Sequence, residues 1–158
     1  MFHRVTLIGR VGQDPQMRYT PDGTPVTTIS VATTTTVSKT LPNGGERPCP
    51  EGWKESYNKR NWELTTWWRV TCWRGLAETV NEYVRKGMQV FVEGEVRGEA
   101  VNGTQNPRVW TGNDGTARAS FELTARTVKF LGSRGDTGGG PPIGEPPPEG
   151  FEEDSLPF

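Results

Sequence analysis

The sequence contains few of the residue types on which catalytic and metal sites depend. Among 158 residues, His3 is the only histidine, and Cys49 and Cys72 are the only cysteines. A zinc site needs three or four suitably spaced His, Cys or carboxylate ligands, and a Ser-His-Asp triad needs a positioned histidine. We therefore expect no metal, no cofactor and no catalytic residue of these kinds.

Motifs that bind nucleotides or carry a nucleophile are also missing. The sequence has neither a GxxxxGK[ST] phosphate loop nor a GxSxG nucleophile elbow. The glycines at 138–140 lie in a proline-rich segment, not between a strand and a helix. Glu93 and Glu95 fall on one face of an expected strand, where solvated charge explains them better than acid–base catalysis. We predict that the protein is not an enzyme.

Long apolar runs are absent too. The N-terminus has no apolar stretch like that of a signal peptide, and nowhere do 18 apolar residues follow one another. These features predict a soluble cytoplasmic protein with no membrane partner. A disulfide is not expected in that compartment, so we interpret Cys72 as a buried apolar residue and Cys49 as a loop residue.

Helical segments are scarce, whereas strand and turn signals recur. Glycine and proline number 20 and 13, and apolar residues make up only 32%, which is typical of strands joined by many turns. Alternating polarity predicts five strands, over residues 2–12, 26–37, 65–73, 88–98 and 120–131. Residues 75–87 predict a helix, with Leu76, Val80, Tyr83 and Val84 on its apolar face and Gly87 as its left-handed cap.

This order of three strands, one helix and two strands is that of the OB-fold. The fold is an all-β, five-stranded Greek-key barrel that is used for single-stranded nucleic acids and oligosaccharides. We assign it to residues 1–131. Residues 132–151 lose all periodicity and predict a flexible Gly/Pro-rich linker, and residues 152–158 form a disordered acidic tip.

Charge is divided unequally between these parts. The formal net charge of the chain is −1, but residues 1–131 carry +4 and residues 132–158 carry −5. A basic body with an acidic tail is a common arrangement in proteins that bind polyanions. An ordinary solvated surface would also account for +4.

The third strand, TTWWRVTCW, has two different faces. Trp67, Arg69, Thr71 and Trp73 point one way, and Trp68, Val70 and Cys72 point the other way. The second set is an ordinary core face. The first set alternates indoles with a cation, which suits base stacking and phosphate binding. From this strand alone, Trp67 and Trp73 could equally be core or interface aromatics.

Two long turn-rich segments carry further aromatic and basic residues. Residues 38–63 interleave Trp53, Tyr57 and Trp62 with the cations Lys54, Lys59 and Arg60, in a stretch where little else is available for packing. Exposed aromatics on a loop favour a binding face. Residues 99–119 have the Asn-Gly and Asp-Gly pairs of a hairpin and place Trp110 near Arg97, Arg108 and Arg118. Solvated arginines and a loop-packing tryptophan remain the alternative for this second segment.

Three segments closely resemble bacterial single-stranded DNA-binding proteins: RVTLIGRVGQDPQMRYTPDGTPVTTISVATT, WWRVTCWRGLAETVNEYVRKGMQVFVEGEVR and the terminal FEEDSLPF. The resemblance implies an OB-fold that assembles as a homotetramer and wraps single-stranded DNA in the bacterial cytoplasm, at the nucleoid. It also implies a C-terminal tip that docks DNA replication, recombination and repair proteins. That tip would comprise Glu152, Glu153, Asp154, Leu156, Pro157 and Phe158.

The resemblance also assigns roles by position. Trp67, Trp73 and Trp110 match base-stacking aromatics, and Arg4, Arg69, Lys86, Arg97 and Arg108 match basic residues that contact DNA. Val37 replaces one stacking tryptophan of the family, and we expect Trp53 and Trp62 of the lengthened first loop to replace that platform. Trp73 stands where phenylalanine is usual, and Trp68 stands where a histidine near a subunit contact is common. The acidic run of the tip is interrupted by Ser155.

Three other functions remain open from the sequence. An OB-containing nuclease or pyrophosphatase would need a carboxylate cluster or metal ligands, which we do not find. A primosomal OB protein would act mainly through protein contacts and would lack the acidic, apolar tip. An RNA-binding OB module would be distinguished by competition between single-stranded RNA and DNA.

Overall fold

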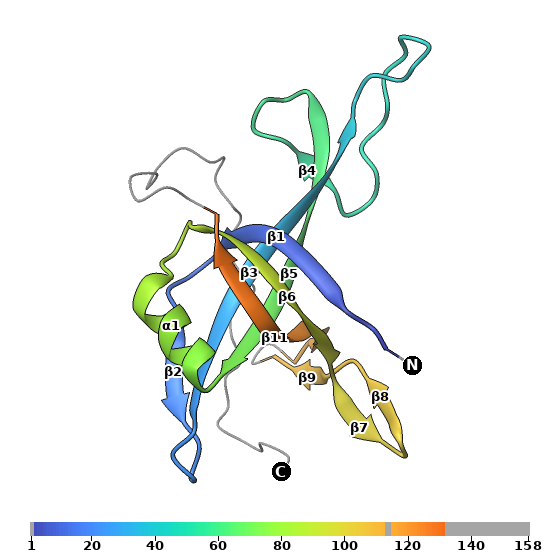
Figure 1. The fold of residues 1–158 in the computed structure, drawn as a ribbon. Coiled ribbons are helices and arrows are strands. Elements are labelled where there is room, and N and C mark those ends of the chain that lie inside the picture. Colours follow the sequence, from blue (N-terminus) through green and yellow to red (C-terminus); the bar gives the residue numbers. More distant parts are fainter. Residues whose placement is uncertain (1, 113–114, 132–158) are drawn as a thin grey trace.

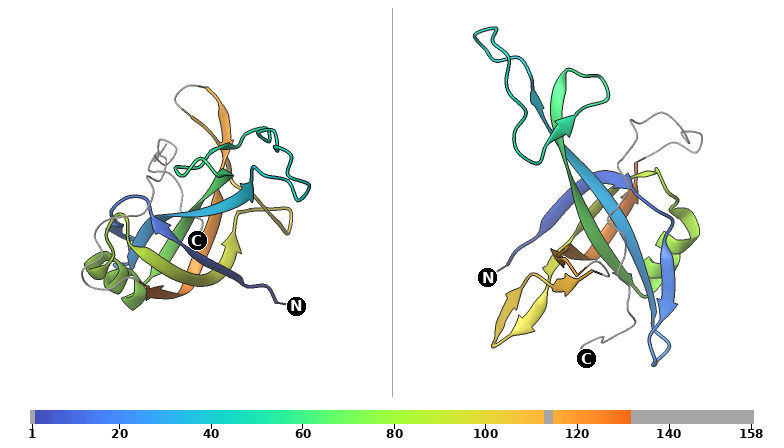
Figure 2. Two further views of the ribbon diagram at one scale, coloured as in Figure 1. Left: turned by 90° about the horizontal axis from the view of Figure 1, so that it is seen from above. Right: turned by 180° about the vertical axis from the view of Figure 1, so that it is seen from behind.

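Five long strands close into a barrel, whose arrangement Figures 1 and 2 show. The computed structural model describes residues 2–112 and 115–131. The barrel strands are β1 (Val5–Val11), β3 (Pro25–Ser38), β5 (Asn61–Trp73), β6 (Gln89–Arg97) and β11 (Phe121–Phe130). Neighbours around the ring are β3, β1, β6, β11 and β5, and β5 pairs with β3 to close it; only the β11–β5 pair is parallel. This closed barrel with one helix after its third strand confirms the predicted OB-fold.

Smaller elements lie between the barrel strands. They are β2 (Gln16–Tyr19), β4 (Lys54–Glu55), α1 (Gly75–Tyr83), β7 (Glu99–Val101), β8 (Thr104–Asn106), β9 (Val109–Thr111) and β10 (Ala117–Ala119). Residues 99–119 therefore form two hairpins, β7–β8 and β9–β10. Asn102 and Gly103, with φ of 50° and 76°, make the first turn, as the Asn-Gly pair predicted. The predicted linker (132–151) and tip (152–158) lie outside the described residues.

The core fills the barrel with mainly β-branched side chains from all five strands. Its fully buried members include Val11, Ile29, Val31, Val70, Cys72, Val90, Val92 and Leu123. Strand alternation predicted this, since Val5, Leu7 and Val11 face inward while Ile8 stays 57% exposed. Burying each large aliphatic side chain is worth about 1.5–3 kcal/mol. Both cysteines are free, with Cys72 buried and Cys49 exposed, as expected.

Helix α1 is shorter than the sequence predicted. It ends at Tyr83 because Val84 is already extended (φ −80°, ψ 142°). Gly87 has the expected positive φ of 87°, but it belongs to the turn into β6, where its N–H donates to the Val11 carbonyl at 2.7 Å. Ala77 is buried beside Val80, whereas Tyr83 is 52% exposed and not part of a buried stripe. The helix covers one end of the barrel, where the buried Thr27 hydroxyl donates to the Ala77 carbonyl at 2.8 Å.

Strands β3 and β5 continue far beyond the barrel. Their antiparallel register is unbroken from Val26–Trp73 to Ser38–Asn61. Strand β1 leaves β3 after Ala32, and β11 joins β5 only from Trp68 onward. Residues 33–66 therefore form a hairpin arm that projects away from helix α1 (Figure 1). Where residues 38–63 were expected to be a loop, strand structure occupies both ends, since tertiary pairing outweighs the local turn signals.

No helix within residues 2–112 and 115–131 has the length and apolar character needed to cross a membrane.

Candidate nucleic-acid interface

The outer face of β5 carries the residues that alternation placed there. Val70 and Cys72 are fully buried, so Trp67, Arg69, Thr71 and Trp73 point outward. Trp73 is 37% exposed, and the other three are half-buried. The two indoles are six positions apart, which corresponds to about 20 Å of strand. The strand therefore presents two aromatic platforms at a distance, with Arg69 between them.

Trp67 lies over the backbone of Gly12, just past the end of β1. A Cβ atom added at Gly12 would come within 2.4 Å of the Cζ3 atom of Trp67. Residue 12 therefore has to be small for the indole to keep its place. Lys86 is close to the same segment: the backbone N–H of Lys86 donates to Asp14 Oδ1 at 2.9 Å, and its side chain is exposed. The Trp67 ring and the backbone of Lys86 therefore both lie against the segment that contains Gly12 and Asp14.

Trp68 occupies the opposite face and has a structural role. Its indole Nε1 donates to Thr33 Oγ1 at 3.0 Å, and its ring lies 5.3 Å from the ring of Phe121. The half-buried ring packs against the buried core of the barrel. This agrees with the expectation that Trp68 belongs to the core face.

Arg69 and Arg97, both of which the sequence predicts to bind DNA phosphates, lie in one row across the sheet with the carboxylate of Glu122. Register places Arg69 of β5 beside Glu122 of β11, and Glu122 beside Arg97 of β6. Arg97 is exposed and donates through Nε to Thr124 Oγ1 at 3.0 Å. Two cations flanking one carboxylate give this row a positive balance. The row continues the outward face of Trp67 and Trp73 around the barrel.

Arg4 reaches the same outer surface but is held by an acid. Its guanidinium lies 2.8 Å from Glu93 Oε1, and both side chains are partly exposed. On β6, Glu95 accepts hydrogen bonds from Arg126, whose guanidinium holds the pKa of that carboxyl below its usual value. Phosphate binding by Arg4 would therefore compete with Glu93 in a solvent-exposed pair, where ion pairs are weak.

Trp110 lies on β9, in the second of the two hairpins. Its Nε1 is 3.3 Å from Ser120 Oγ, and the guanidinium of Arg118 stands 5.5 Å from its ring centroid. Arg108 is half-buried two residues earlier. The β7–β8 hairpin and the hairpin arm project from different ends of the barrel (Figures 1 and 2).

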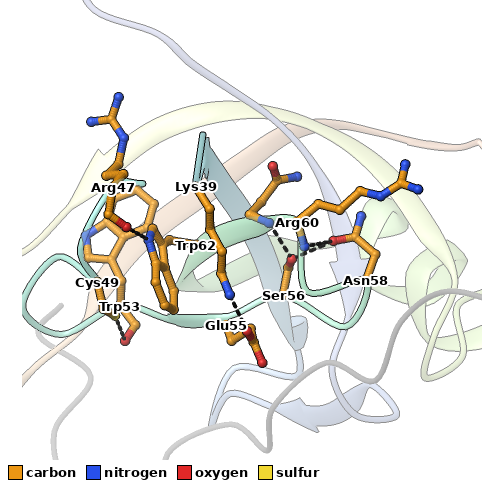
Figure 3. A network of polar contacts seen from close by, with 10 residues as sticks. Lys39, Arg47, Cys49, Trp53, Glu55, Ser56, Asn58, Arg60 and Trp62 are labelled. Carbon is orange, nitrogen blue, oxygen red and sulfur yellow. Dashed lines mark hydrogen bonds and ion pairs between the residues drawn. The ribbon is translucent and has the colours of Figure 1, made fainter. Parts of the chain in front are cut away.

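Trp53 and Trp62 are packed within the hairpin arm and are not exposed loop residues. Trp62 lies on β5, its Nε1 donates to the Arg47 carbonyl at 3.0 Å, and Lys39 Nζ stands 4.1 Å above its ring (Figure 3). Trp53 is half-buried, and its carbonyl accepts from Cys49 Sγ at 3.4 Å. Trp62 also points to the face of β5 opposite Trp67, since five positions separate them. One ring face of Trp62 is thus already covered by a cation.

A salt bridge fixes the loop end of the arm, where the β3–β5 ladder stops. Lys39 binds Glu55 of β4 while also covering Trp62, and its hydrogen bond holds the pKa of the Glu55 carboxyl below its usual value (Figure 3). Lys54 pairs with Glu63 at 3.2 Å on the neighbouring positions. The arm is therefore an ordered element with its own polar network.

A groove of about 500 Å³ opens where β1 diverges from β3. Its walls come from the outer faces of β1, β3 and β5 and from residues 54–58. Its lining includes Ile8, Arg10, Thr34, Thr36, Tyr57 and Asn61. Tyr57 is 78% exposed. The sequence grouped it with Trp53 and Trp62 on a loop that favours a binding face, beside Lys54, Lys59 and Arg60, but assigned it no stacking role of its own. Within the described residues no group of three or more His, Cys, Asp or Glu side chains could hold a metal ion.

Comparisons with known proteins agree with this architecture. Residues 2–131 match the model of the single-strand binding protein family. A protein of Xylella fastidiosa (strain 9a5c) named single-stranded DNA-binding protein 1 is 37% identical over 134 residues, which cover 85% of this chain and 80% of the relative. Single-stranded DNA-binding proteins of two Neisseria meningitidis strains are 34% identical over 143 residues, which cover 90% of this chain and 67% of each relative. The chain belongs to the single-strand binding protein family.

Proposed function

We propose that this protein binds single-stranded DNA without sequence preference and protects it. The observation that carries the proposal is the outer face of β5, on which Trp67 rests over Gly12 with Arg69 and the exposed Trp73 on the same face. Family membership supports the same function. The mechanism is binding without chemistry. As a consequence, a covered DNA strand can neither pair again nor be reached by nucleases.

Base stacking supplies the aromatic part of the affinity. Each stacked base contributes about 1–3 kcal/mol and requires no particular base, because every base has a π-face. Trp67 and Trp73 are the first platforms in this proposal, and Trp110 is a third on the β9–β10 hairpin. Trp53 and Trp62 are kept in the proposal as stacking residues, but they rank second because both are partly buried and a cation already covers Trp62.

Phosphate pairing supplies the electrostatic part. Arg69 lies between the indoles on β5, and Arg97 lies in the same row on β6. Lys86 borders the segment under Trp67, and Arg4 and Arg108 extend the basic path. Neutralising phosphates releases counterions, so affinity falls as salt concentration rises.

A fluorescence titration tests this function. Oligothymidylate should quench the tryptophan emission strongly at low salt, and the affinity should fall linearly on a log–log plot as salt increases. Absence of quenching at low salt would contradict the proposal. Competition with single-stranded RNA in the same assay identifies the preferred strand, and a complex mass measured in parallel yields the stoichiometry.

The remaining parts of the proposal concern assembly and partners. We propose that residues 1–131 form the DNA-binding domain and assemble as a homotetramer, and that residues 132–151 tether the tip. Residues 152–158 then recruit replication, recombination and repair proteins through three acids followed by Leu156 and Phe158. Such a protein would act in the bacterial cytoplasm, at the nucleoid.

A further inference from the structure

We propose that the turn over residues 56–61, at the end of β4, forms an additional single-stranded DNA contact in which Tyr57 stacks on a base and Lys59 and Arg60 bind the adjoining phosphates. This inference rests on the proposed DNA-binding function and assigns a new subsite to the hairpin arm. It does not involve Trp53 or Trp62, whose rings are packed into the arm.

The turn is rigid because one nearly buried side chain holds it from within. Ser56 is only 7% exposed, and its backbone N–H donates to the Asn61 carbonyl at 3.0 Å. Its hydroxyl donates to Asn58 Oδ1 at 2.7 Å and accepts from the Asn61 N–H at 3.1 Å (Figure 3). The same Asn58 oxygen accepts from the Arg60 N–H at 3.0 Å. Because both ends of the turn are fixed, its backbone loses little conformational entropy when the outer side chains bind a ligand.

Lys59 adds an observation that points to function. Its φ is +59°, in the left-handed region where a residue with a long side chain costs roughly 1–2 kcal/mol relative to glycine. The turn nevertheless carries lysine at this position, with its backbone N–H donating to the Ser56 carbonyl at 2.9 Å. A cation at this strained position is consistent with a role for its charge.

Tyr57 faces the groove that joins the turn to the outer face of β5. It lines this groove together with Thr65, Glu63 and Asn61. These three share their face of β5 with Trp67, since only even spacings separate them. The strand from Asn61 to Trp67 covers about 20 Å. A nucleic-acid strand stacked on Trp67 can therefore continue along the groove, over hydroxyl and amide groups that suit sugar and phosphate contacts, toward Tyr57.

The charge around the turn favours a polyanion over a second protein surface. The acids on the adjoining strand positions, Glu55 of β4 and Glu63 of β5, are paired with Lys39 and Lys54. Lys59 and Arg60 then leave the turn with a positive balance. Protein interfaces are depleted of charge at their centre, and apart from Tyr57 this turn is polar. A tyrosine that is 78% exposed between cations instead has the composition of a single-strand stacking site.

The experiment compares full-length protein with Tyr57→Ala and Tyr57→Phe in oligothymidylate titrations. We expect Tyr57→Ala to weaken binding of a strand of about 30 nucleotides by about fivefold or more and to leave binding of one of about 8 nucleotides unchanged. Tyr57→Phe should retain the affinity, because it keeps the ring. Tyr19→Ala is the matched control, as Tyr19 is 65% exposed on β2 and does not line the groove.

The basic pair is tested by the salt dependence. The double variant Lys59→Gln/Arg60→Gln should lower the slope of log K against log salt by about 0.7 for each phosphate that the variant no longer binds. Photo-crosslinking to an iodouracil-substituted strand should mark Tyr57, as identified by mass spectrometry.

The outcomes separate this inference from the proposed function. If wild-type protein fails to bind DNA, the proposed function fails together with the subsite. If wild-type binds but Tyr57→Ala binds both strands equally well and Tyr57 is not crosslinked, only the subsite is overturned. A changed oligomer mass in Tyr57→Ala with unchanged affinity per subunit would also overturn it and would assign the turn to contacts between copies of the chain.

Discussion

Trp67 and Gly12 pack so closely that residue 12 sets the position of the indole. The Cζ3 atom of the ring would lie 2.4 Å from a Cβ atom placed on Gly12, well inside van der Waals contact. Gly12 follows β1, and its N–H donates to the Ser30 carbonyl at 2.9 Å. The backbone there is anchored to β3, so the ring is the part that must move.

Gly12→Ala is therefore expected to displace the Trp67 ring and to weaken oligothymidylate binding by about 1 kcal/mol, or roughly fivefold. The folded barrel should persist, because the added methyl group meets the end of a half-exposed side chain. Gly75→Ala is the control, since its Cβ would meet nothing within 4 Å. Equal affinity and quenching in the two variants would show that Trp67 is not a stacking platform.

Substitutions of Trp68 and Trp73 should have different effects, the first on folding stability and the second on DNA affinity. Trp68→Ala removes a hydrogen bond to Thr33 and a ring contact with Phe121, so the free energy of unfolding should fall by about 2–4 kcal/mol. Trp73→Ala should change it by less than about 1 kcal/mol while costing about 1–3 kcal/mol of DNA affinity. Denaturant unfolding and fluorescence titration measure the two effects. A stable Trp73→Ala variant with wild-type affinity would exclude Trp73 from the interface.

The ion pair between Arg4 and Glu93 predicts opposite effects of removing its two members. Glu93→Gln frees the guanidinium from its partner at 2.8 Å and removes a negative charge from the outer face, so binding at low salt should tighten. Arg4→Gln should weaken binding and lower the salt slope by about 0.7, the value for one phosphate on a single strand. Titrations over a salt series measure both. If neither substitution alters the slope, Arg4 lies off the path of the strand.

The barrel could be predicted from the sequence because its signals are local and periodic. Alternation at Val5, Leu7 and Val11, and again at Val70 and Cys72, defines inward faces without any knowledge of the partner strands. The two outward tryptophans of β5 follow from the same alternation. The end of helix α1 was misplaced by four residues because the sequence around Arg85 and Lys86 is compatible with a helix, whereas the chain turns early to let Gly87 bond to Val11.

The hairpin arm could not be predicted because its contacts are long-range. Pairing of Val37 with Trp62, and the stacking of Lys39 on that ring, join residues more than twenty positions apart. Gly44, Gly45 and several prolines dominate the local signal of residues 38–63 and indicate only a loop. The same limit applies to the site, because spacing alone does not tell that Glu93 holds Arg4 or that Lys39 covers Trp62.

Because the thiol of Cys72 is buried, we expect the protein to become less stable at alkaline pH. Burial raises the pKa of its thiol to about 12, whereas an unfolded cysteine has a pKa of about 8.5. Between these values the unfolded state loses the proton and the folded state keeps it, so the free energy of unfolding falls as pH rises above about 9. Cys72→Ala should reduce this slope relative to wild-type, and Cys49→Ala, at an exposed thiol, should not. Identical pH slopes in both variants would contradict the protected state of Cys72.

Deletion of residues 156–158 tests the tip independently of the barrel. These residues follow Glu152, Glu153 and Asp154, and they lie outside the described residues, as does the whole segment that carries a net charge of −5. Because that segment repels phosphate, its acids can only oppose DNA binding through long-range repulsion, and three apolar residues contribute nothing to the basic path. We expect the deletion to leave DNA affinity unchanged or raised while abolishing capture of replication and repair proteins from a lysate. A control deletion of the same length within residues 132–151 should retain capture, and loss of DNA binding on deleting 156–158 would place the tip within the fold.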